Sequence, residues 1–148
     1  MAAVRLLVLL LLLVGACNDV REFEGTWIGP RVGDAAVLHV GVGMTATADL
    51  AIDGIDTHGI RGHLTISGLV DNAEYTSIEG AEADVLSGMT FDGSPARVYL
   101  AFFAVPDAGG EALAVIALYD DKRVEVRVLR GGAQPLYGIF SLSQGSAE

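Results

Sequence analysis

The sequence has few of the residues that cross-link a small protein or give it a positive charge. It contains one cysteine, Cys17, among 148 residues. A single cysteine excludes an internal disulfide and a zinc site built from several cysteines. Nine Lys and Arg stand against nineteen Asp and Glu, which gives a formal net charge of −10. A chain this acidic repels phosphate backbones, so we expect no nucleic-acid partner.

Motifs of catalysis and of phosphate binding are also missing. The chain has no Gly-x-Ser-x-Gly and no His-Glu-x-x-His, the patterns of two common classes of hydrolase. Gly41-Val42-Gly43 lacks a third glycine and a following helical pattern, so it indicates a turn and not a phosphate-binding loop. We therefore predict that the protein is not an enzyme and needs no cofactor.

Apolar residues, in contrast, are abundant. They make up 51% of the chain, which argues against disorder, and the length suggests one domain with a core of its own. Met1–Ala16 begins with one arginine, continues as an unbroken apolar run from Leu6 to Val14, and ends in small residues. This layout predicts a signal peptide, because the apolar run is shorter than the ~20 residues that span a bilayer.

Val14-Gly15-Ala16-Cys17 resembles the lipobox of bacterial lipoproteins, although leucine is commoner than valine at its first position. The resemblance implies cleavage before Cys17 and acylation of Cys17 with chains such as palmitate, so that the lipid makes the membrane a partner. Two or more acyl chains anchor a protein firmly, whereas one does so only marginally. Asn18 stands where aspartate would resemble an inner-membrane retention signal. The implied location is thus the bacterial cell envelope, with the outer membrane favoured; the alternative is a secreted protein with a free cysteine.

The chain accordingly divides into a signal peptide (1–16), a lipidated N-terminus with a short linker (17–22) and one domain (23–148). In this domain, short apolar or alternating runs are separated by Gly, Asp and Pro. Ile60–Ser67 and Arg123–Arg130 alternate most cleanly, as strands with one solvent-facing side do. The candidate runs are 22–28, 35–40, 45–52, 60–67, 75–79, 81–86, 89–91, 97–105, 112–119, 123–130 and 136–142, of which those between 72 and 87 have the weakest pattern.

This rhythm predicts the fold class. Eight to ten short strands at spacings of about 8–12 residues, with no sustained helical period, favour an all-β antiparallel domain. It is either an up-and-down barrel or a sandwich. A closed barrel suits such short turns because closure removes exposed strand edges.

Gly25-Thr26-Trp27 resembles the Gly-x-Trp motif at the start of lipocalins and related small barrels, the calycins. The resemblance implies that Trp27 closes the barrel floor, that Gly25 lets the chain bend past it, and that the barrel binds a small apolar ligand. The chain departs from the family in having no Thr-Asp-Tyr-like motif, no C-terminal helix pattern and no disulfide. A core tryptophan in any β domain is the alternative. A barrel of eight strands can hold a ligand or be filled by its own side chains.

The hairpin 97–119 is apolar on both of its faces, whereas antiparallel strands with one wet face should alternate. Its outer face needs a cover: either a second layer of this chain, or an envelope protein, a second copy of the chain or the membrane. This gives a second hypothesis, an interaction or scaffold lipoprotein with no ligand cavity. The residues predicted for its interface are Tyr99, Phe103, Ile116 and Leu118.

Two further possibilities carry less weight. His58 and His63 follow Asp53 and Asp56, and imidazole with carboxylate can bind a divalent ion. Asp53-Gly54-Ile55-Asp56 is also typical of a hairpin turn, in which Asp bonds its own backbone, so we predict no metal site. Small lipocalin-like barrels also resemble bacterial metalloprotease inhibitors, but these act through an N-terminal segment that a lipid on Cys17 would hold.

Overall fold

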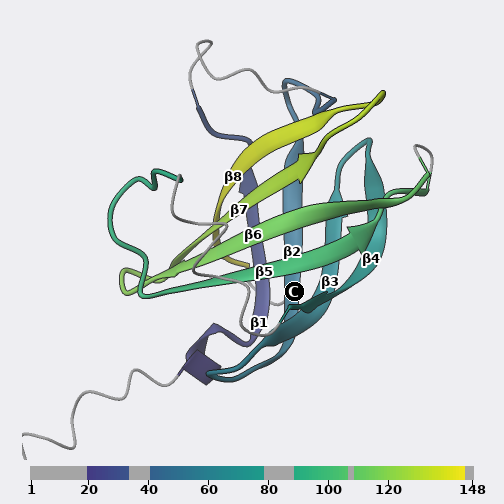
Figure 1. Ribbon diagram of the computed structural model, residues 1–148. Coiled ribbons are helices and arrows are strands. Elements are labelled where there is room, and N and C mark those ends of the chain that lie inside the picture. Colours follow the sequence, from purple (N-terminus) through teal and green to yellow (C-terminus); the bar gives the residue numbers. More distant parts are fainter. Residues whose placement is uncertain (1–19, 34–40, 79–88, 107–108, 146–148) are drawn as a thin grey trace, which may run out of the picture.

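The computed structural model describes residues 20–33, 41–78, 89–106 and 109–145. These residues form a closed barrel of eight antiparallel strands in which each strand pairs with its neighbours in the sequence and β8 pairs with β1 (Figure 1). The predicted all-β antiparallel fold is thereby confirmed, and of the two architectures that the sequence left open it is the up-and-down barrel and not the sandwich. The strands are β1 (Gly25–Pro30), β2 (Thr47–Ile55), β3 (Ile60–Ile66), β4 (Val70–Ser77), β5 (Arg97–Ala104), β6 (Glu111–Tyr119), β7 (Arg123–Arg130) and β8 (Leu136–Gln144).

Some of the candidate runs differ from these strands. The first begins too early, because Val20–Phe23 form a short 3₁₀ helix, η1, and the strand starts only at Gly25. Met89–Phe91 has no strand structure. The runs 35–40 and 81–86 fall outside the described residues.

The inward and outward alternation of β3 follows its sequence. The side that carries Ile60, Leu64 and Ile66 is buried in the core, and the side with Arg61 and His63 faces outward. In β4 the alternation is interrupted. The pairing of β3 with β4 shifts register between Leu64 and Ile66, and a bulge of this kind puts an extra residue into one strand and breaks the period of two. The irregular pairing explains why this strand has a weak pattern in the sequence.

Closure of the barrel brings β1 and β8 very close together. β1 pairs with β2 along its whole length, but only Trp27 and Ile28 have partners on β8, followed by an isolated bridge from Arg31 to Phe140. At Gly29 a Cβ atom would lie 1.9 Å from the carbonyl oxygen of Ser141. The barrel therefore closes at a point where only glycine fits.

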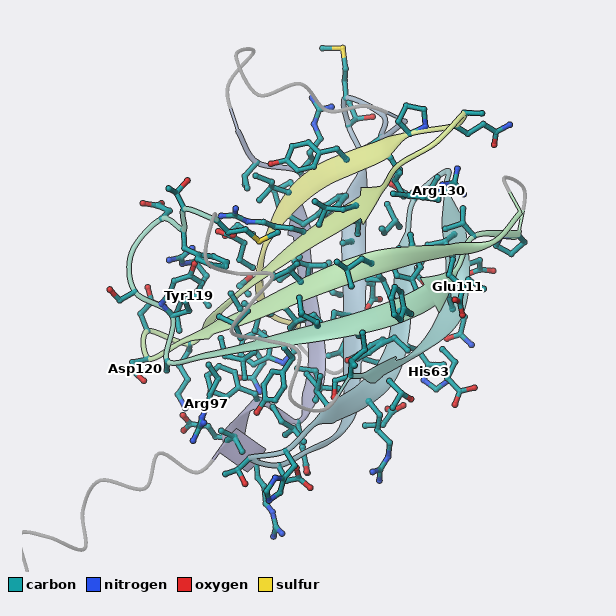
Figure 2. All side chains as sticks on the ribbon, viewed as in Figure 1. His63, Arg97, Glu111, Tyr119, Asp120 and Arg130 are labelled. Carbon is teal, nitrogen blue, oxygen red and sulfur yellow. The ribbon has the colours of Figure 1, made fainter. Side chains whose placement is uncertain are left out.

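The barrel has two distinct ends. The η1 end carries η1 and the β2–β3 and β6–β7 turns, and the far end carries the β3–β4, β5–β6 and β7–β8 turns. Figure 2 shows Tyr119 and Asp120 at the first end and Glu111 and Arg130 at the second. The backbone N–H of Gly145 donates to the carbonyl of Thr26. The described chain thus begins and ends at the η1 end.

Candidate functional site

The barrel floor is built around Trp27, one of the two residues that the Gly-x-Trp resemblance singles out. Trp27 is fully buried, its Nε1–H donates to the carbonyl of Phe23 at 2.8 Å, and its ring stacks on the Phe23 ring with centroids 5.6 Å apart. The second residue, Gly25, has φ of +123°, a backbone conformation that side chains disfavour. At this glycine the chain turns from η1 into β1, so η1 caps the floor.

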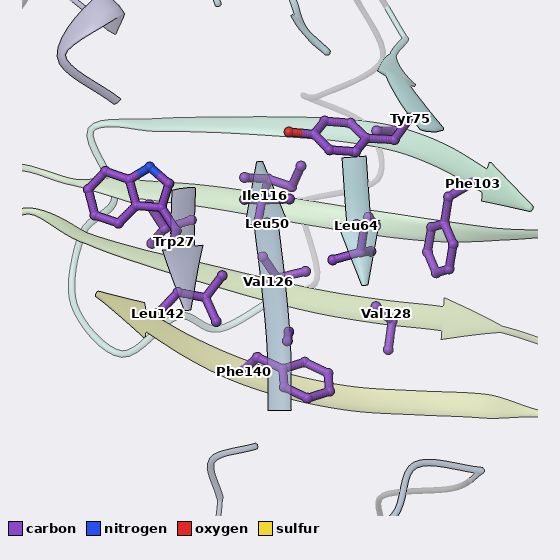
Figure 3. Close-up of a cluster of buried hydrophobic side chains, with 14 of the residues drawn as sticks. Trp27, Leu50, Leu64, Tyr75, Phe103, Ile116, Val126, Val128, Phe140 and Leu142 are labelled. Atoms are coloured by element: carbon purple, nitrogen blue, oxygen red, sulfur yellow. The ribbon is translucent and has the colours of Figure 1, made fainter. Parts of the chain in front are cut away.

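Above this floor, a cluster of buried apolar side chains lies inside the barrel (Figure 3). A side chain that lines a ligand cavity keeps accessible surface facing the cavity. Leu50, Leu64, Ile116 and Val126 have a relative accessibility of 0%. Space for an apolar ligand at these residues would require core side chains to move.

The far end of the barrel is filled in a similar way. Val42, in the loop after β1, is buried, and a Cβ on Gly138 of β8 would lie 2.9 Å from its Cγ2. The carbonyl of Val42 also accepts a hydrogen bond from Arg31 Nη1 at 3.4 Å. The loop therefore inserts a side chain into the interior where β8 has none.

The residues predicted for an interface on hairpin 97–119 do not form an exposed surface. Tyr99, Phe103, Ile116 and Leu118 belong to the buried core cluster and are at most 3% accessible. A hairpin that is apolar on both faces gives no parity signal, so the sequence did not reveal which face points inward.

The outer face of this hairpin is largely covered by the chain itself. Leu100, Val115 and Ala117 point outward yet are at most 1% accessible. Phe102, which is 47% accessible, is the exposed large side chain of this face among the described residues. The cover that the sequence requires is therefore supplied mainly within one chain.

A group of charged side chains lies beside a pocket on the outer wall of β7. Arg123, Glu125 and Arg127 alternate with inward-facing valines, as the sequence predicts, but Glu125 and Arg127 are 4% and 9% accessible. The segment before β5 lies over them: Arg127 Nη2 donates to the carbonyl of Thr90 at 2.7 Å and Arg123 Nη2 to that of Asp92 at 2.9 Å. These two arginines hold the segment against the barrel.

Not every polar atom of these charged groups has a hydrogen-bond partner among the described residues. Arg127 Nε donates to Glu125 Oε1 at 2.6 Å. The other carboxylate oxygen, Glu125 Oε2, has Arg123 Nη1 at 3.9 Å, which is beyond hydrogen-bond distance. Beside this group is a pocket of about 670 Å³, which we call the outer pocket. Its lining includes Val32, Phe91, Asp92, Asp121, Ile139 and Ser141 together with the Arg and Glu side chains of β7.

Tyr119 lies next to Arg123 at the η1 end of the same wall. The Arg123 guanidinium carbon is 3.7 Å from the centroid of the Tyr119 ring. The buried hydroxyl has no hydrogen-bond partner among the described residues, and burial raises the pKa of Tyr119. The Tyr119 ring, the Arg123 guanidinium and the Glu125 carboxylate thus follow one another along the outer wall.

The β2–β3 hairpin contains the carboxylates and histidines considered for a metal. Asp56 Oδ1 accepts hydrogen bonds from the backbone N–H groups of His58 and Gly59 at 2.7 and 2.9 Å, and these bonds lower the pKa of Asp56. His63 Nδ1 lies 2.8 Å from Asp53 Oδ2. The Asp56 geometry is the predicted turn chemistry, and within the described ranges no three His, Cys, Asp or Glu side chains are grouped as metal ligands would be.

Comparisons with known proteins add no family to this description: no family model, no curated protein and no solved structure matches the chain. Among the residues described by the structure, no helix has the length and apolarity needed to cross a bilayer.

The sequence predicts which charged side chains share the face of the outer pocket, but it does not predict that they are buried. Arg-x-Glu-x-Arg on an alternating strand indicates that three charges share one face, but it also suits a solvated surface. The segment Thr90–Asp92, which contacts Arg127 and Arg123, lies far away in the sequence and forms no strand, although 89–91 was a candidate run.

Proposed function

We propose that this protein is a lipid-anchored lipoprotein of the bacterial cell envelope whose barrel acts without catalysis, by binding a partner on its outer wall. The observation that carries the proposal is the contrast between the two sides of the wall. The interior side chains Leu50, Leu64 and Ile116 have no accessible surface, whereas the outer side has a pocket of about 670 Å³ beside a buried ion pair. Binding sites combine apolar walls with a few converging polar groups in this way.

The lipobox resemblance and the position of η1 support the anchor. Val20, the first residue of η1, comes three residues after Cys17, so the two lie at most about 11 Å apart even when the chain is extended. η1 is fixed to the barrel by the Phe23–Trp27 contact and by the ion pair of Lys122 with Glu22. An acylated Cys17 would therefore keep the η1 end of the barrel close to the membrane.

Replacing Cys17 with serine is expected to abolish acylation and to move the protein out of the membrane fraction. Serine has no thiol to form the thioether, and acyl chains are what hold a peripheral domain on a bilayer. The measurement is incorporation of an alkyne-labelled palmitate in the native host, together with pelleting of membranes after a high-salt wash. The acyl label is informative even if an uncleaved leader keeps some variant on the membrane.

Asn18→Ala is the matched control, since it alters the neighbouring residue and keeps the thiol. It should retain both the label and the membrane association. Equal labelling of the Cys17→Ser chain and the wild type would disprove the anchor.

Native mass spectrometry of the processed protein, purified from its host, tests the outer-wall partner. We expect a complex of defined mass, with a second protein or a second copy, that is lost in Glu125→Gln and kept in Glu111→Gln. Glu111 is an exposed carboxylate at the far end, so its variant makes the same chemical change away from the outer pocket. A monomer that carries a discrete small apolar molecule would overturn this and favour an interior carrier function.

A further inference from the structure

We propose that the outer pocket recognises an uncharged peptide group flanked by an apolar side chain. This inference rests on the proposed function, because it names the chemistry that the outer wall binds. It follows from three properties of the pocket: the balance of its charges, the unused hydrogen-bonding atoms, and the apolar side chains beside them.

The lining of the outer pocket has charges of both signs, so an ionic ligand of either sign would have a like charge beside it. An anion would meet the buried carboxylate of Glu125, with Asp92 and Asp121 in the same lining. A cation would meet the guanidinium groups of Arg123 and Arg127. Like charges brought together in a partly desolvated site repel each other strongly. A neutral ligand avoids both repulsions.

The unused atoms match the two polar atoms of a peptide group. Glu125 Oε2 is an acceptor with no hydrogen bond to the described residues, since Arg123 Nη1 is 3.9 Å away. Arg127 uses Nε for Glu125 and Nη2 for the carbonyl of Thr90, and its Nη1 makes no hydrogen bond within the described part of the chain. A peptide N–H can donate to the carboxylate oxygen while its C=O accepts from the guanidinium. Hydrogen bonds to charged groups are the stronger ones in proteins.

The remaining walls suit the apolar side chain beside such a peptide group. Phe91 packs against Arg127, whose guanidinium carbon lies 4.5 Å from the ring centroid. Val32 and Ile139 complete the apolar part of the lining. The volume of about 670 Å³ lies within the usual range of small-molecule sites, which is roughly 300–1,000 Å³.

Three small leucine derivatives with the same side chain and different charges test this assignment. They are N-acetyl-L-leucinamide, which is neutral, N-acetyl-L-leucine, which is anionic at pH 7, and L-leucinamide, which is cationic at that pH. Each is titrated into the processed, ¹⁵N-labelled protein while the amide resonances of residues 90–92 and 123–127 are recorded. We expect the neutral probe to shift these resonances and the two ionic probes to bind about tenfold more weakly or worse.

The variant Glu125→Gln should weaken binding of the neutral probe by about tenfold, because it removes the charged acceptor and keeps the side-chain shape. Glu111→Gln is the control and should bind as the wild type does. If Glu125→Gln fails to fold, the three probes on the wild-type protein decide the matter alone.

Equal binding of all three probes, tighter binding of an ionic probe, or no shift of these resonances would overturn the assignment. The proposed function is tested separately, by the native mass spectrometry of the host protein. If the host protein forms a complex that depends on Glu125 while no probe binds, the outer wall binds a partner through other chemistry. If the neutral probe binds and the host protein carries no partner, the assignment of the pocket stands and the function does not.

Discussion

Trp27→Ala is expected to lower the free energy of unfolding by about 3–5 kcal/mol, the usual cost of deleting a large aromatic side chain from a core. Trp27 is fully buried, stacks on Phe23 and donates a hydrogen bond to the carbonyl of that residue. Its loss therefore removes apolar contacts from the barrel floor and also leaves that carbonyl without its donor. Domains of this kind are stable by only about 5–15 kcal/mol, so much of the population is expected to unfold under mild denaturing conditions.

Urea unfolding followed by far-UV circular dichroism is the suitable measurement. Tryptophan fluorescence is not, because Trp27 is the only tryptophan of the chain. Trp27→Phe is the matched control, since it keeps an aromatic ring and removes the Nε1–H donor. It should cost less than the alanine variant, and the difference reports the loss of the ring. A Trp27→Ala protein as stable as the wild type would show that the floor does not depend on this side chain.

Gly62→Ala is expected to cost about 3 kcal/mol, at or above the upper end of the usual range for overpacking. A Cβ at position 62 would lie 1.9 Å from the carbonyl oxygen of Ala51 and 2.9 Å from the hydroxyl of Tyr75. These two atoms are themselves joined by a hydrogen bond of 3.0 Å. The obstacle is backbone as well as side chain, so β2 and β3 would have to separate locally to make room.

Gly131→Ala provides the control for this change. A Cβ there meets no atom within 4 Å, so the same substitution should change the free energy of unfolding by no more than about 0.5 kcal/mol. Thermal and urea unfolding of both variants, followed by circular dichroism, give the comparison. If the two substitutions cost the same, the close approach at Gly62 is not a constraint on the barrel.

The fold could be predicted from the sequence where one face of a strand is exposed to solvent and the other is buried. Ile60–Ile66 and Arg123–Arg130 alternate cleanly, and both are strands whose predicted apolar sides point into the barrel. Short turns and the absence of a helical period predicted sequential antiparallel hairpins, but they did not distinguish a closed barrel from a sandwich.

Prediction failed where the residue pattern of a strand is the same for a buried face and an exposed face. Hairpin 97–119 is apolar on both sides, so the sequence did not distinguish Phe103, which points inward, from Phe102, which points outward. The outer pocket was missed for a related reason. Glu125 is buried, and the contacts of Thr90 and Asp92 with the neighbouring arginines are ones that no local periodicity encodes.

The position of the two chain ends has a practical consequence for experiments on cells. Because Gly145 bonds to Thr26 beside η1, a reporter fused after it would lie at the η1 end, the end that the proposed anchor on Cys17 would hold near the membrane. If Cys17 is acylated as proposed, such a fusion would crowd the gap between the domain and the bilayer. Epitopes inserted in the β7–β8 turn, where Gly131 has open space around it, would instead project from the opposite end and leave both the anchor and the wall of β7 unobstructed.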